Sequence, residues 1–136
     1  MREVVSGLSP AFLDWKPGAE TNSIAALIAH TLDSERGLTA IVASTARPRD
    51  REAAFRVSGL SADDLVTMID AAERDVDGFL AGLTEQRLDA PIERPMRTAS
   101  GAWWLLHAAV HSREHIGQAA LTRQLAEQAM AARQGT

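Results

Sequence analysis

The sequence predicts an all-α fold, a four-helix bundle with a short first helix and a long crossover connection. Alanine, the best helix former, supplies 25 of the 136 residues, whereas tyrosine is absent and Phe and Trp occur three times each. Apolar residues recur at intervals of three and four along three long stretches. The length, with 46% hydrophobic and 24% charged residues, suits a single globular domain over residues 1–136.

The N-terminal segment predicts one short helical piece, at about 3–8 or 10–13, which is too short for a full bundle helix. The first long helix is expected to begin at Asn22 or Ser23, either of which can serve as N-cap, and to end before Pro48. Its apolar stripe consists of Ile24, Leu27, Ile28, Leu32, Leu38, Ile41 and Val42.

A second long helix follows a connection at 47–60, which we expect to be a loop with an extended piece at 55–57. The helix itself is expected over about 62–83. Its start is marked by Ser61 and Asp64, which have the spacing of a capping box with Asp in place of Glu or Gln.

The last helix is expected over about 102–133, after a cap near Ser100. Two prolines, Pro91 and Pro95, interrupt the connection at 84–101, which makes a regular helix there unfavourable. We therefore expect this connection to be a long crossover and not a tight hairpin.

Charge and cysteine content exclude several classes of function. The net charge of −4 provides no general attraction to nucleic acid or to an anionic membrane, so neither is expected as a partner. With no cysteine, the chain has neither disulfides nor a catalytic thiol, and any thiol must enter as a substrate. The first eight residues lack the apolar run of a signal peptide, so a cytoplasmic location is expected. Among the 14 basic residues only one is lysine, a bias typical of a GC-rich bacterial genome.

The four histidines all lie within predicted helices. His107, His111 and His115 recur every four residues, which places them on one face of the last helix, where neighbours can share a metal ion. His30, in the first long helix, can complete a three-nitrogen site with either adjacent pair, and spacing alone does not choose between the pairs. Neutral imidazole suits zinc, nickel, copper or iron, and three protein ligands with an open position are typical of catalytic metals.

A competing motif overlaps this run. His111-Ser-Arg-Glu-His115 matches the H-x-x-E-H pattern of a metallopeptidase class in which the glutamate, here Glu114, is the general base. That class takes a third, acidic ligand from a separate downstream element. Only 21 residues follow His115, and the one acid among them, Glu127, would lie about 18 Å further along the same helix. We therefore expect Glu114 to be solvated or to lie beside the site.

Two more residues share the histidine face of the last helix. Trp104 could line a substrate pocket, although core packing is the more usual role of such a residue. Gln118, one turn after His115, could orient a metal ligand or a bound water.

Together these residues resemble the DinB-like superfamily, which includes YfiT-type metal hydrolases, mycothiol-dependent maleylpyruvate isomerase and bacillithiol transferases. The resemblance covers nearly the whole chain and rests on the order and spacing of four short motifs: Trp15-x-Pro17, Asn22-Ser23-Ile24, Ile28-x-His30, and His111-x-x-x-His115-x-Gly117-Gln118. It implies a four-helix bundle, often dimeric. It also implies His30, His111 and His115 as the ligands of a divalent metal, with His107 one turn away, beside the site or lining its pocket. Relatives usually have a longer first helix than the 14 residues before Trp15 allow.

The resemblance further implies a metal-dependent enzyme acting on a small molecule. Zinc or nickel is the expected metal, with iron as a third choice. The activated group is a low-molecular-weight thiol, as in an S-transferase or isomerase, or water, as in a hydrolase; similar proteins favour the thiol. The alternative is a non-enzymatic metal-binding or stress-related dimer that serves as an interaction module.

Overall fold

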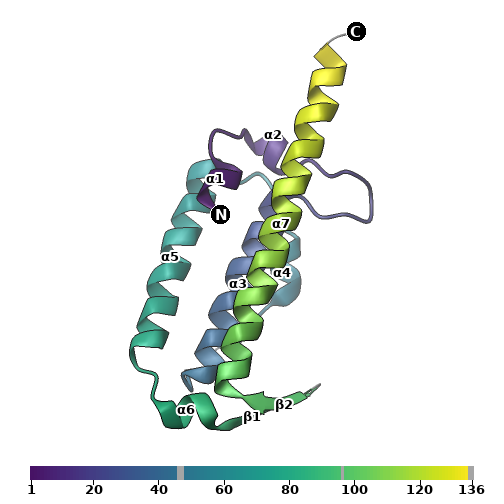
Figure 1. The fold of residues 1–136 in the computed structure, drawn as a ribbon. Helices are drawn as coiled ribbons and strands as arrows, with labels where there is room; N and C mark the ends of the chain where they lie inside the picture. The colour runs from purple at the N-terminus through teal and green to yellow at the C-terminus, as the bar shows by residue number, and fades with distance from the viewer. Residues whose placement is uncertain (46–47, 96, 135–136) are drawn as a thin grey trace.

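The computed structural model describes residues 1–45, 48–95 and 97–134, and it is mostly helical, as predicted. Three long helices form its body: α3 (Ile24–Val42), α5 (Ala62–Ala81) and α7 (Gly101–Gln134). Both α5 and α7 pack on α3, and the C-terminal part of α7 projects beyond the other helices (Figure 1). The helices described here include none long and apolar enough to cross a membrane.

The first helix is short, as predicted, and is divided into α1 (Arg2–Val5) and α2 (Pro10–Leu13). α1 packs against α5 and α7. Arg123 of α7 holds it there by donating hydrogen bonds to the backbone carbonyls of Glu3 and Val4 (2.8 and 3.1 Å).

The most deeply buried element is α3. All ten residues from Ser23 to Leu32 are buried, and the main apolar core forms around them. The side chain of Ser23, one of the two predicted N-caps, accepts a hydrogen bond from the Ala26 amide (3.2 Å). At the other end, Arg87 donates to the carbonyls of Ile41 and Val42 and so provides a partner for acceptors in the last turn of the helix.

The predicted capping box of α5 is confirmed. The Asp64 amide donates to Ser61 Oγ (3.1 Å), and the Asp64 carboxylate accepts from the Ser61 amide (2.9 Å). The apolar stripe that follows packs on α3, with Leu65, Ile69 and Ala72 buried.

The expected loop with an extended piece at 55–57 is wrong in part, because residues Arg51–Phe55 form a short helix, α4. The Asp50 carboxylate caps it by accepting from the Ala53 amide (2.9 Å), and Ala54 is buried where α4 packs on α3. The cap and this packing stabilise a helical turn that is too short to show a helical periodicity in the sequence.

The connection between α5 and α7 is long, but the expectation that it contains no regular helix is wrong. It contains α6 (Glu85–Asp89) and an antiparallel hairpin of β1 (Pro91–Arg94) and β2 (Arg97–Ser100). The first proline is the first residue of a strand, and the second lies in the turn between the strands; both positions tolerate a missing amide donor. Trp104 Nε1 donates to the Ile92 carbonyl (3.3 Å), which fixes the hairpin to the start of α7.

The close approach of α6 to α7 predicts that Gly101→Ala destabilises the protein. A Cβ at Gly101 would overlap the backbone carbonyl oxygen of Arg87, which cannot move as freely as a side chain can. We expect a loss of roughly 1–3 kcal/mol in the free energy of unfolding. The matched control is Gly78→Ala in α5, where a Cβ meets nothing and should stabilise the helix by up to about 1 kcal/mol. Urea unfolding of both variants checks this, and equal stabilities would contradict it.

Candidate metal centre

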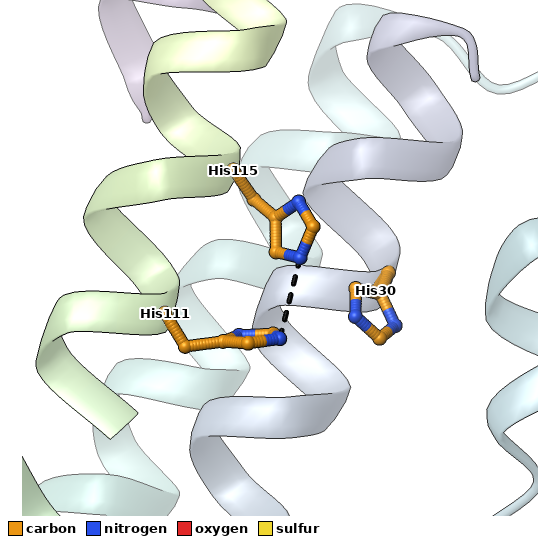
Figure 2. Close-up of side chains that lie close together, drawn as sticks. All are labelled: His30, His111 and His115. Carbon is orange, nitrogen blue, oxygen red and sulfur yellow. Dashed lines mark hydrogen bonds between the residues drawn. The ribbon is translucent and has the colours of Figure 1, made fainter. Parts of the chain in front are cut away.

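Three histidines from two helices come together on the buried side of α7. His30 of α3 faces His111 and His115 of α7, and Figure 2 shows the three rings turned toward a common point. One nitrogen from each ring lies within 4.8 Å of the other two. Sequence spacing left two pairs open, and the packing of α7 on α3 brings the second pair, not the first, against His30.

The two α7 histidines are placed as ligands of one ion would be. His111 Nε2 and His115 Nε2 are 3.2 Å apart (Figure 2). Two nitrogens bound to one tetrahedral zinc ion at about 2.0 Å are separated by about 3.3 Å. The separation of the three nitrogens is wider than a bound ion requires, so we expect the rings to close slightly on binding.

Gln118 fixes the orientation of the His115 ring. Its side-chain oxygen lies 2.8 Å from His115 Nδ1 and can only accept, so this nitrogen carries the proton. The Nε2 lone pair is then directed at His111. Gln118 therefore holds His115 in the tautomer that a metal ligand needs.

Burial favours the neutral form of His30 and His111. His30 is 3% exposed, and burial, followed by the proximity of His115 and His111, lowers its pKa from 6.5 to about 4. Burial and His115 also lower the pKa of His111. The Nδ1 atoms of His30 and His111 are buried and have no hydrogen-bond partner in the described part of the chain. A cluster of imidazoles whose neutral form is favoured is a donor set that fits a divalent cation.

A feature that the sequence did not reveal covers His30. Phe55 of α4 stacks on the His30 ring, with centroids 4.2 Å apart and an interplanar angle of 25°. The Arg51 guanidinium lies on Phe55, with Cζ 5.4 Å from the ring centroid. The only sequence signal was Asp50, a cap residue three positions before Ala53, in a segment that was expected to be a loop.

Comparison with known proteins is consistent with this geometry. Residues 1–119 match the sequence model of the DinB superfamily. The chain belongs to the DinB superfamily. A solved structure of a DinB-like protein (YjoA) from Bacillus subtilis superposes with a TM-score of 0.71 at 19% identity, covering 90% of this chain and 81% of that one. At this identity the likeness concerns the fold alone. Among curated proteins, none matches.

The other candidate residues of this DinB-superfamily chain lie outside the group of three histidines. His107 stacks on Trp103 (centroids 5.1 Å apart), and its ring centroid is 6.1 Å from that of His111, outside the group of three. Trp104 is buried in a second apolar cluster beside the hairpin. Glu114 is exposed, and its charge partly offsets the lowering of the His111 pKa.

A pocket is lined in part by Gln118, the residue that contacts His115. It has a volume of about 370 Å³ and lies between α7 and the segment that leads into α3. Its lining is mostly apolar, with Leu27, Leu121 and Leu125 beside Gln118. A small molecule bound there would lie next to the residue that orients His115.

The lowered pKa of His30 predicts a loss of stability in acid for the metal-free protein. Below pH 6.5 His30 becomes protonated in the unfolded chain, whereas in the folded chain it becomes protonated only when the pH falls to about 4. The free energy of unfolding should fall through this window by about 3 kcal/mol in total. Urea unfolding of chelator-treated protein at pH 7, 5.5 and 4.5 measures it. His30→Gln lacks the group and is the control; parallel curves for the two proteins would contradict the prediction.

Proposed function

We propose that this DinB-superfamily protein is a metal-dependent enzyme in which His30, His111 and His115 hold a divalent ion that activates a low-molecular-weight thiol, or water, for attack on a small molecule. The observation that carries the proposal is the convergence of three imidazoles, with one nitrogen of each within 4.8 Å of the others, from two helices packed on each other. Zinc and nickel suit such ligands best, and iron is also compatible.

An ion held by three neutral ligands would lower the pKa of a group bound at its open position, so that this group becomes a nucleophile near neutral pH. The chain's own residues hold and orient the ligands. Burial keeps His30 and His111 unprotonated, Gln118 sets the tautomer of His115, and Phe55 covers the His30 ring. No carboxylate belongs to the described three-residue group, so these ligands would not neutralise the charge of a bound divalent ion.

The thiol is the better substrate for this site than water. The 136-residue sequence contains no cysteine, so a thiolate must come from solution, and the cavity beside Gln118 has room for a small molecule. Transfer forms a sulfur–carbon bond at an electrophile and releases its leaving group and the thiol proton to solvent. The family resemblance noted in the sequence points to the same chemistry.

One observation favours a second function, that of a non-enzymatic, dimeric metal-binding module. Four large apolar side chains of α7 are exposed in this single chain: Leu106, Val110, Leu121 and Leu125. Exposed apolar groups that gather on one element are typical of an interaction surface. Metal binding without thiol transfer, together with a dimer in light scattering, would favour this second function.

The metal site predicts a clear pattern of metal content. Untagged wild-type protein should hold about one zinc or nickel ion per chain, and His30→Ala, His111→Ala and His115→Ala should each lose it, because two imidazoles bind a divalent ion much more weakly than three. His107→Ala is the matched control and should keep the ion, since His107 lies outside the group. Plasma mass spectrometry of dialysed protein measures this. A metal-free wild type, or loss of metal in His107→Ala, would refute the assignment.

The role of Gln118 predicts a selective loss of affinity. Gln118→Leu frees the His115 tautomer and should weaken metal binding about 10- to 100-fold. Gln124→Leu, the same change at an exposed position of the same helix, should leave affinity unchanged. Competition with a chromogenic zinc chelator gives both affinities. Equal values for the two variants would mean that Gln118 does not orient the ligand.

A further inference from the structure

The charge around the three histidines is unbalanced. Neutral imidazoles do not compensate a divalent cation, and no carboxylate belongs to the described ligand group. Two arginines, Arg49 and Arg51, lie close enough for their charges to lower the pKa of His30. The charge of Glu114, on the exposed side of α7, also reaches the group. The three candidate ligands therefore bring no negative charge of their own, and two arginines lie near them.

Of the two arginines, Arg49 already has a partner. Its Nε and Nη2 both donate to one Asp33 carboxylate oxygen (3.0 and 2.7 Å). It crosses α3 at Gly37, where a Cβ would overlap its side chain. Arg49 is thus held flat against α3 with its charge largely paired.

Arg51 is the arginine that remains available. Its ion-pair contact with Glu52 is 3.9 Å long, and the two side chains are 67% and 69% exposed. A contact of this length between exposed side chains contributes little and is easily exchanged for another anion. The neighbouring Asp50 is engaged elsewhere, because it caps α4 and pairs with Arg56 (3.6 Å).

The short helix α4 sets the position of Arg51. Arg51 and Phe55 are one turn apart on α4, so the guanidinium lies on one side of the Phe55 ring and His30 is stacked against that ring. The Asp50 cap and buried Ala54 hold α4 on α3. One aromatic ring therefore separates an available cation from a candidate metal ligand, a separation that a small molecule can span.

We propose that the substrate carries a carboxylate or similar oxyanion. Arg51 binds this group while the reacting end of the substrate lies at the three histidines. This inference rests on the proposed function. It assigns Arg51 a role in substrate selection and defines the substrate class as a small anion. Arginine suits that role because its planar guanidinium can donate two parallel hydrogen bonds to an oxyanion.

The test compares two small thiols that differ in charge. Cobalt-loaded protein is titrated with 3-mercaptopropionate and with 2-mercaptoethanol, and the thiolate-to-cobalt absorption in the near ultraviolet reports binding. The measured quantity is the ratio of the two affinities in each protein, since this ratio cancels differences between the thiols themselves. The ratio of the affinity for 3-mercaptopropionate to the affinity for 2-mercaptoethanol should be about tenfold higher in wild type than in Arg51→Gln. The affinity for 2-mercaptoethanol itself should be the same in both proteins.

Two further variants sharpen the result. Arg51→Lys keeps the charge and should retain part of the preference, whereas Arg56→Gln removes an exposed arginine that pairs with Asp50 and should leave the ratio as in wild type. An unchanged ratio in Arg51→Gln, or an equal loss in Arg56→Gln, would overturn the inference while leaving the proposed function intact.

Failure of the proposed function gives a different result. In that case cobalt does not bind, or neither thiol produces the absorption band in wild type, and the inference falls with it. Metal content measured on every titrated sample separates loss of the ion from loss of anion binding.

Discussion

The packing of α3 on α7 is the interaction on which the rest of the structure depends. It helps to bury the stretch from Ser23 to Leu32, whose apolar side chains form the main core together with those of α5, and it places the buried His30 against α7. The same contact selects which turn of α7 faces His30. Stability and site geometry are therefore properties of one helix pair, and a change that separates the helices would remove both together.

The site is assembled at the expense of some stability. Unpartnered nitrogens and depressed pKa values mark His30 and His111 as groups that folding buries at a cost. Packing elsewhere offsets it: the capped α5, the hairpin tied to Trp104, and α1 tied to Arg123. A local loss of stability at a cluster of metal-ligating side chains is expected where ligand binding to the folded state restores the lost free energy.

Much of this could be predicted from the sequence, and the failures have physical causes. Helical periodicity and the caps at Ser23 and Ser61 located the long helices, because both signals depend on neighbouring residues only. The choice between two histidine pairs depends on the rotation of α7 against α3, which periodicity does not contain. Helix α4 and the hairpin were missed because tertiary packing stabilises segments too short for a pattern, and Phe55 over His30 was therefore unforeseen.

The anchoring of α7 at its first turn limits how this chain can vary in length. Trp104 ties the start of the helix to Ile92, and the histidines follow on the same continuous helix, two and three turns further on. Each residue inserted or deleted between Trp104 and His111 would turn both histidines by about 100° away from His30. Changes in chain length can therefore be accommodated in the surface connections but not between Trp104 and His111. Each residue in that stretch helps to set the angle at which the α7 histidines face His30.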